Sequence, residues 1–460
     1  MTTNLHDARR GSDMTIASTS TSTSAPAPRR HPTGDWFGQP RGLTILFLTE
    51  MWEMFSFSGM RILLVYYMIK QLAFSQANAS LLFGLYAGGV YLTPIFGGYI
   101  ADRWLGRQRA VVVGGLLMAT GHFMLTQESL FFAALGVIAL GNGLFLPNLA
   151  SQIDDLYAAN DTRRGGAYNI YYLGVNIGGL LAPLVCGTLG EVYGWHYGFG
   201  AAGVGMCVGL VVYLAGRRHL LSDAARKAAR PAVVREATLT VAGTTGVFLL
   251  VSLAVIVFRV AYGQSGNTLS VWVDQSVDLT ASGFRIPATW VQALNSLMVF
   301  PLTPIVVSAW RRAASVGREP SPIRKMVLGA LGVGVSYLLL ALAAHLASRS
   351  AALVHWSWLV LFFAVYTAAE LYILPVALSL FVRLAPEGRE ATAIAGFLLS
   401  SFVGYLVSGV VGTWWSVMSP AAFFVAMAAI TALSALILLA TAPLLGRVDR
   451  QAKPLAERPA

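Results

Sequence analysis

The chain has 460 residues, of which 56% are hydrophobic and only 12% are charged, about half the charged share of an ordinary soluble domain. A soluble fold of this size has too little polar surface to cover so many apolar side chains, so we expect a lipid bilayer as solvent. The net charge of +11 suits either nucleic-acid binding or the basic cytoplasmic loops of a membrane protein.

Residues 1–41 differ in composition from the rest of the chain. Their Ser-, Thr-, Ala- and Pro-rich run, 17–28, has no apolar periodicity, which predicts a disordered tail. The tail contains no apolar segment that could form the core of a signal peptide, so we expect it to stay in the cytoplasm.

Apolar stretches of about twenty residues follow from Gly42 onward, and each is long enough to cross a bilayer as a helix. We therefore predict an all-α integral membrane protein with twelve transmembrane helices. A basic linker, 217–238, separates two six-helix halves, 42–216 and 239–445, and a second tail follows at 446–460. The predicted spans are 42–69, 78–101, 108–126, 129–155, 165–188, 195–216, 239–262, 286–310, 325–347, 355–383, 390–416 and 420–444.

The positions of the positive charges predict the orientation of these spans. Of the 32 Lys and Arg, only Lys70, Arg285 and Arg349 fall in connections on the side opposite the tails, and Arg61 and Arg259 fall within spans. Positive residues accumulate in cytoplasmic loops, so we expect both termini in the cytoplasm and the protein in the cell's inner membrane. The same rule accounts for the basic charge, and no nucleic-acid partner is expected.

Other chemistry finds little support in the sequence. The two cysteines both lie in apolar runs, and the seven histidines are scattered without metal-ligand spacing. We predict no metal and no cofactor. Without a nucleophile–base pair, an enzyme is not expected.

Five charged side chains fall within or close to the membrane interior. Such groups usually mark a transport path, although internal structural salt bridges are an alternative. Glu50 and Glu53 share one face of the first helix, whereas Arg61 lies about 16 Å further along it. Glu50 and Glu53 are therefore the candidates for carrying a proton. Arg259 and Glu370 are placed where they could pair across the second half.

The connection between the second and third spans reads Gly97-Gly-Tyr-Ile-Ala-Asp-Arg-Trp-Leu-Gly-Arg-Gln-Arg109. It resembles the loop motif of the major facilitator superfamily (the MFS fold), in which glycines allow close packing and charged groups latch the cytoplasmic side. The resemblance assigns this latch to Asp102, Arg103 and Arg107.

The first span resembles a narrower family. Glu50-Met-Trp-Glu-Met-Phe-Ser-Phe-Ser-Gly-Met-Arg61 is similar to the ExxERFxYYGMR segment of proton-dependent oligopeptide transporters, the POT family. Further similar segments extend the resemblance over nearly all of 42–445. They are Gly121-His-Phe123, Gly141-Asn-Gly-Leu-Phe-Leu-Pro-Asn148, Tyr171-Tyr-Leu-Gly-Val-Asn-Ile-Gly178, Gly194-Trp-His-Tyr-Gly-Phe-Gly-Ala-Ala-Gly203, Gln264-Ser-Gly266, Gln292-Ala-Leu-Asn295 and Ala369-Glu-Leu-Tyr-Ile-Leu-Pro375.

This resemblance implies a monomeric symporter that takes up di- and tripeptides, with proton entry driving two halves to rock around a central site. Asn176, Asn295 and Glu370 would hold the amino end of the peptide, and Arg61 its carboxylate. Tyr91 matches a tyrosine that lines the cavity in the family.

Three positions depart from the family pattern. Met54, Leu146 and Gly263 stand where the family has an arginine, a lysine and a glutamate, and Arg259 lies one turn before Gly263 where an aromatic is usual. Arg259 is therefore a further candidate for substrate binding. Two alternatives to proton-coupled peptide uptake stay open: an uncoupled facilitator or exchanger of another solute, for which two cavity arginines favour an anion, and a non-transporting membrane sensor.

Overall fold

The structure is a computed structural model that describes residues 38–158, 161–223, 242–281, 283–385 and 390–452. The tail predicted at 1–41 and the linker predicted at 217–238 lie mostly outside these residues. The described chain is almost wholly helical. Its α-helices are α1 (Arg41–Lys70), α2 (Gln76–Ile100), α3 (Arg107–Met124), α4 (Phe131–Ala150), α5 (Arg164–Ala182), α6 (Trp195–Gly216), α8 (Ala242–Tyr262), α9 (Thr268–Ser276), α10 (Ala293–Ser315), α11 (Pro322–Ser350), α12 (Ser357–Arg383), α13 (Glu390–Gly412) and α14 (Pro420–Ala452).

Ten helical stretches of the described chain are long and apolar enough to cross a membrane. α1 and α3 are outside this set, and α1 carries Glu50, Glu53 and Arg61. The all-helical membrane class predicted from composition is confirmed at this level. The ten stretches are Gln76–Leu105, Glu128–Leu156, Arg164–Tyr193, Trp195–His219, Thr245–Ser276, Ala288–Ser315, Pro322–Ser350, Ser357–Arg383, Ala391–Ser416 and Pro420–Leu445.

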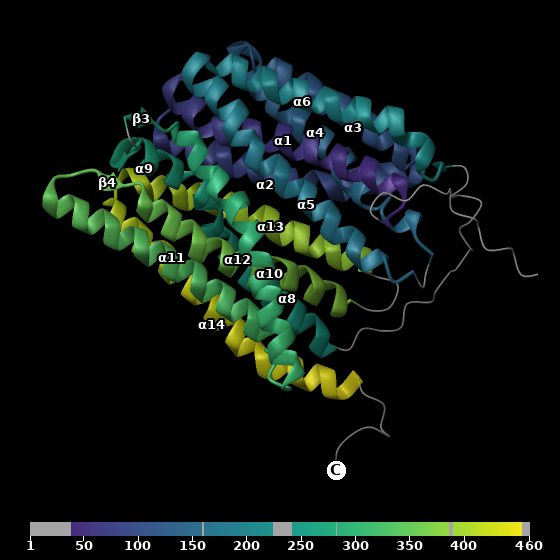
Figure 1. Cartoon of the computed structure of the whole chain (residues 1–460). Helices are drawn as coiled ribbons and strands as arrows, with labels where there is room; N and C mark the ends of the chain where they lie inside the picture. The colour runs from purple at the N-terminus through teal and green to yellow at the C-terminus, as the bar shows by residue number, and fades with distance from the viewer. Residues whose placement is uncertain (1–37, 159–160, 224–241, 282, 386–389, 453–460) are drawn as a thin grey trace, which may run out of the picture.

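The helices form two bundles. In the first bundle, α1 packs against α5 and α6, and α3 packs against α4 and α6; in the second bundle, α11 packs against α12 and α14, and α8 against α13 and α14. Figure 1 shows α1 to α6 in its upper part and α11 and α14 in its lower part. The main contacts between the bundles are α2 with α13 and α5 with α10. A small cavity, described below, lies between these two helix pairs.

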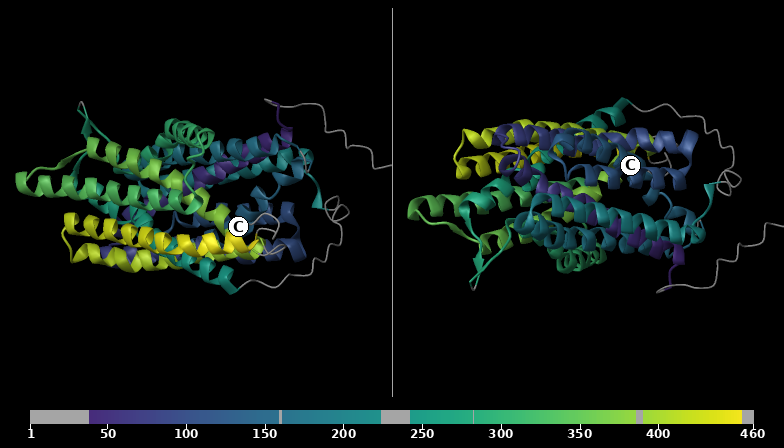
Figure 2. Two further views of the ribbon diagram at one scale, coloured as in Figure 1. Left: turned by 90° about the horizontal axis from the view of Figure 1, so that it is seen from below. Right: turned by 90° about the horizontal axis from the view of Figure 1, so that it is seen from above.

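The long helices of both bundles run along one common direction, as the two views of Figure 2 show. α1 begins and α14 ends at the same end of the molecule, which we call the tail end (right in Figure 1). The opposite end, called the far end, carries α9 and four two-residue strands. The strands are β1 (Val277–Asp278), β2 (Thr280–Ala281), β3 (Phe284–Arg285) and β4 (Val354–His355); β1 pairs with β4 in parallel and β2 with β3 antiparallel.

Residues 263–285, between two of the predicted spans, contain the short helix α9. Leu269, Trp272 and Val273 of α9 are buried in the second bundle, and the Trp272 ring lies 5.1 Å from that of Phe424. Burial of these apolar side chains supplies the stability that a nine-residue helix lacks by itself.

Glycines set the spacing of the helices at several crossings. A Cβ on Gly84 of α2 would lie 2.5 Å from the Cα of Gly409 in α13, and one on Gly178 of α5 would lie 2.2 Å from the Met51 carbonyl oxygen in α1. Helix backbones can approach this closely only because the glycine at the crossing has no side chain. The glycine content of the sequence therefore serves packing inside the molecule.

Hydrogen bonds join the two bundles at the far end. Lys70 of α1 forms an ion pair with Asp274 of α9 at 2.7 Å, and the Tyr66 hydroxyl donates to the Ser270 carbonyl oxygen at 3.1 Å. Glu191, in a π-helical stretch (Leu189–Tyr193) after α5, accepts from the Ala288 backbone N–H at 3.0 Å. These bonds connect the two bundles at the far end.

Candidate functional site

A small cavity of about 60 Å³ lies between the bundles, enough for several water molecules. Arg61 of α1 lines its wall in the first bundle, and Tyr262, Asn295 and Tyr405 line the wall in the second. The cavity therefore brings side chains far apart in sequence to one point. A group the size of an ammonium or a carboxylate fits there.

Glu370 of α12 is held from two sides within the second bundle. Tyr262 of α8 donates its hydroxyl to Glu370 Oε1 at 2.8 Å, and Asn295 of α10 donates its amide to Glu370 Oε2 at 3.0 Å. The same amide is 3.1 Å from Thr367 Oγ1. Both carboxylate oxygens are oriented by neutral donors, which leaves the negative charge available to a cationic group.

Arg259 of α8 lies in a cage of aromatic rings. Its guanidinium carbon is 5.2–5.8 Å from the ring centroids of Tyr91, Tyr262, Phe397 and Tyr405. Cation–π attraction to rings at this distance stabilises a desolvated guanidinium. The side chain is buried, and its Nε has no hydrogen-bond acceptor in the described part of the chain.

The sequence suggested an ion pair between Arg259 and Glu370, but the structure has no such pair. Tyr262 and Asn295 occupy both oxygens of Glu370, and Arg259 stacks on rings instead. Arg61 likewise has its guanidinium 5.7 Å from the Phe57 ring. Within the described residues neither arginine has a carboxylate partner, so the site holds two cations and one anion without a direct pair.

Two further predicted site residues lie beside this group in different ways. The Tyr91 ring stacks on Tyr405 of α13 with the centroids 5.2 Å apart, which places it against the Arg259 cage. Asn176 is buried on α5 and donates its amide to the Tyr172 carbonyl oxygen of its own helix at 2.8 Å. Tyr91 thus contacts other site residues, whereas the hydrogen bond of Asn176 stays within α5.

The two glutamates of α1 form a separate group inside the first bundle. Glu50 and Glu53 are 2% and 1% exposed, and Asn142 of α4 approaches Glu53 Oε1 at only 3.5 Å. Among the described residues, Glu50 Oε2 and Glu53 Oε2 have no hydrogen-bond donor, and no cation pairs with either side chain. These are the least satisfied carboxyl groups described in the structure.

The predicted latch residues lie at the tail end. Arg107 donates to the Ser151 carbonyl oxygen at 2.9 Å and to Asp155 Oδ2 at 3.3 Å. Asp102 and Arg103 are exposed in the π-helical stretch between α2 and α3 (Ala101–Leu105).

Two of the three positions that depart from the family pattern, Gly263 and Met54, have defined local surroundings. A Cβ on Gly263 would lie 2.5 Å from Ser408 Oγ, so α13 occupies the space that a longer side chain would need. Met54 accepts a hydrogen bond at its sulfur from the Ser58 hydroxyl at 3.2 Å. Met54 and Gly263 are both neutral, so neither supplies a charged side chain.

Sequence reasoning did not select Tyr262, Tyr405, Thr367 or Asn142. Tyr262 was within reach, because it follows Arg259 by three residues and must share its helical face. Tyr405 and Asn142 carry no comparable signal, since their roles depend on how α13 and α4 are rotated against α8 and α1.

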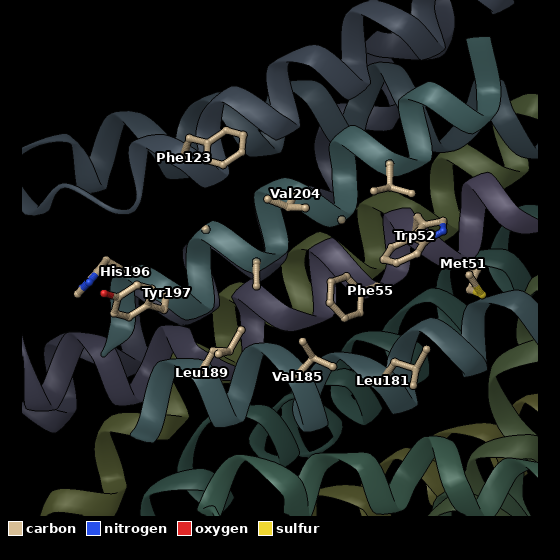
Figure 3. Close-up of a pocket in the computed structure, with 14 residues that line it drawn as sticks. Met51, Trp52, Phe55, Phe123, Leu181, Val185, Leu189, His196, Tyr197 and Val204 are labelled. Atoms are coloured by element: carbon tan, nitrogen blue, oxygen red, sulfur yellow. The ribbon is translucent and has the colours of Figure 1, made fainter. Parts of the chain in front are cut away.

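A larger cavity of about 590 Å³ lies between α5 and α6 with α1 at its floor (Figure 3). Trp52 and Phe55 form the floor, and Leu181, Val185 and Val204 line the walls. This lining is almost wholly apolar and offers no group for an ammonium or a carboxylate. It suits hydrocarbon chains, and none of the site residues above contributes to it.

Comparison with known proteins connects this geometry to a family. The POT family (PTR2) profile matches residues 108–246 and 244–430. The chain is 33% identical to a di-/tripeptide transporter of Lactococcus lactis subsp. cremoris over 440 residues, covering 79% of this chain and 87% of that protein. It is 31% identical to the uncharacterized transporter YclF of Bacillus subtilis, covering 90% and 96% of the two chains.

The fold agrees with the sequence matches. A crystal structure of a peptide transporter, POT, in complex with sulfate superposes with a TM-score of 0.82 at 30% identity, covering 91% of this chain and 97% of that one. The profile match and the structural neighbour name the POT family, and both relatives are named as transporters. The chain therefore belongs to the POT family of membrane transporters.

Proposed function

We propose that this protein takes up di- and tripeptides, or related small compounds with both an amino and a carboxylate group, by alternating access. The observation that carries the proposal is Glu370, held by two residues, Tyr262 and Asn295, that line the same cavity as Arg61. Arg259 stacks on the ring of Tyr262 and so lies beside the same cavity. One anion and two separate cations match the ends of a zwitterion. The names of the relatives support the same substrate class.

The peptide's ammonium would bind Glu370, and its carboxylate would bind a guanidinium. Charge-assisted hydrogen bonds of this kind are short and about twice as strong as neutral ones, and a planar guanidinium matches a carboxylate with two parallel bonds. Such recognition uses only the backbone termini, so side chains of different size are accepted. Asn176 would add an amide near the amino end.

Proton coupling is proposed to act through Glu50 and Glu53. A buried carboxyl group without a cation is less costly when it carries a proton, and both side chains are buried without one in the described chain. Met54 takes the place of the cation that would keep them ionised. Exchange of the proton with substrate binding would then drive the two bundles between their states.

The proposed topology has twelve spans, with α1 and α3 added to the ten apolar stretches, and both termini in the cytoplasm. The halves are residues 42–216 and 239–445, joined by the cytoplasmic linker, and the protein acts as a monomer in the inner membrane. In this arrangement the tail end is cytoplasmic, and Asp102, Arg103 and Arg107 would latch it in the opposite state. The bonds at the far end support a conformation closed to the outside.

Uptake of a labelled dipeptide into proteoliposomes, with and without an inward proton gradient, tests this proposal. We expect the wild type to concentrate the dipeptide only with the gradient. Glu53→Gln should lose the gradient dependence, while Glu319→Gln, the same change in an exposed side chain bonded to Lys325, should keep it. Uptake that ignores the gradient in the wild type, with unchanged transport by Glu53→Gln, would overturn proton coupling.

A second candidate, an exchanger or facilitator for an anion, rests on Arg259 alone. Its Nε has no acceptor among the described residues although the side chain is buried, and an anionic ligand would supply one. Thermal unfolding with dipeptides and with dicarboxylates or phosphonates separates the two, because a bound ligand stabilises the protein by mass action. A shift with peptides alone contradicts the anion candidate.

A further inference from the structure

A third cavity, of about 630 Å³, lies at the tail end between α3 and α6, outside the proposed transport site. Gln108, Arg109 and Val113 of α3 line one side, and Leu214 and Tyr213 of α6 line the other. The lining is completed by Trp104, Leu105, Gly106, Val112, Arg217 and Asp223. It therefore combines cations, an exposed indole and an apolar wall.

Two unpaired cations stand at its rim. Arg109 and Arg217 are exposed, and in the described part of the chain neither has a hydrogen-bond or ion-pair partner. Asp223, the acid in the lining, binds the first turn of α3. Its Oδ1 accepts hydrogen bonds from the backbone N–H groups of Arg107 at 3.0 Å and Gln108 at 3.4 Å. The two guanidinium groups are thus left to bind an anion.

In the topology proposed above, the cavity lies where α3 and α6 pass from the membrane to its cytoplasmic surface. Arg217 directly follows α6, and Arg109 is the third residue of α3. Val113 and Leu214, 38% and 42% exposed, lie about one turn deeper in the bundle. Trp104 is 66% exposed and packs edge-on against Tyr99, as aromatic side chains do at the head-group level.

We infer that this cavity binds an anionic phospholipid, with its phosphate between Arg109 and Arg217 and one acyl chain along Val113 and Leu214. Basic pockets between transmembrane helices at the cytoplasmic face bind such head groups. The wall of valine and leucine gives the hydrocarbon chain a surface that a free phosphate ion would not use.

The lipid would also act on the fold around it. It would connect the start of α3, adjacent to Arg107, with the end of α6 at the beginning of the linker between the halves. Binding would stabilise the tail end of the first bundle by mass action. The site is independent of the peptide site and of the proton carriers.

The test measures lipid binding to the purified full-length protein by native mass spectrometry and by thermal unfolding. The probes are dioleoyl phosphatidylglycerol, dioleoyl phosphatidylcholine with the same chains, and glycerol 3-phosphate without chains. The wild type should bind and be stabilised by phosphatidylglycerol alone. Each arginine near an anionic head group contributes about fivefold in affinity, so Arg109→Gln with Arg217→Gln should weaken phosphatidylglycerol about 25-fold.

Arg311→Gln with Arg312→Gln is the matched control, since it removes two exposed arginines at the end of α10; its binding should stay at the wild-type level. Val113→Trp keeps both charges and fills the apolar wall, and it should weaken phosphatidylglycerol even if the double arginine variant fails to fold. Equal binding by the pocket variants and the control overturns the site. If glycerol 3-phosphate stabilises the protein as much as phosphatidylglycerol does, the assignment of a lipid ligand is overturned and the cavity is a phosphate site.

Discussion

Glu370 and Arg259 share one neighbour, Tyr262, but they are held by different interactions. Tyr262 donates to Glu370 and also supplies one of the rings over Arg259. The carboxylate is oriented by two hydrogen bonds. The guanidinium is held by aromatic rings, and its Nε has no acceptor among the described residues. One side chain is thus prepared for a cation and the other for an anion, and single substitutions can separate the two roles.

Replacing Glu370 with Gln should weaken dipeptide binding about 10- to 100-fold, since a hydrogen bond to a charged group contributes about 1.5–3 kcal/mol. Binding of dialanine and of N-acetyl-dialanine, measured by thermal shift or calorimetry, checks the direction. The wild type should prefer dialanine, and Glu370→Gln should bind both equally weakly. If the variant keeps the wild-type preference, Glu370 does not hold the amino end; Glu319→Gln serves as control.

Replacing an arginine should instead change the response to the carboxyl end. We expect Arg61→Gln and Arg259→Gln each to weaken dialanine about 10-fold or more, and to affect dialanine amide much less, because the amide lacks the charge that these arginines bind. Calorimetric affinities of the two ligands for each variant give the comparison. An equal loss for both ligands would assign the arginine to structure rather than to the carboxylate.

The sequence was enough to predict which charged residues lie inside the helix bundles, but not which side chains they contact. Glu50, Glu53, Arg61, Arg259 and Glu370 were found because a charge in an apolar span is conspicuous. Their partners could not be found in the same way. Whether Glu370 meets Arg259 or Tyr262 depends on helix rotations of a few tens of degrees, which hydropathy does not encode when a helix is apolar on every side.

The same contrast appears among the helices. Most predicted spans lie within a few residues of helices in the structure, because the thickness of a bilayer sets the length of an apolar segment. α9 was missed because Thr268–Ser276 mixes polar and apolar residues and is stabilised by burial against α14. Contacts between distant segments of this kind leave no mark in local composition.

The crossing of α2 and α13 is sensitive to a single methyl group. Gly84→Ala would place a Cβ 2.5 Å from Gly409 Cα and 2.7 Å from its nitrogen, so the two helices must separate. We expect a loss of about 1–3 kcal/mol in stability, as for overpacking elsewhere, and slower uptake. Gly89→Ala in the same helix meets nothing within 4 Å and should leave both unchanged; equal unfolding temperatures for the two variants would contradict this account.

Alternating access requires the bonds between the bundles at the far end to break in every cycle. Lys70 and Asp274 face one another across the two bundles, whereas Gln71 and Glu128 form a bond of the same length, 2.7 Å, inside the first bundle. In a background with Cys186→Ser and Cys207→Ser, the pairs Lys70→Cys with Asp274→Cys and Gln71→Cys with Glu128→Cys can be joined by a short, reducible bifunctional reagent. The crosslink between bundles should reduce dipeptide uptake more than tenfold and a reductant should restore it, while the crosslink within one bundle should leave uptake unchanged. Full uptake with the first crosslink complete would show that the bundles do not separate at the far end during transport.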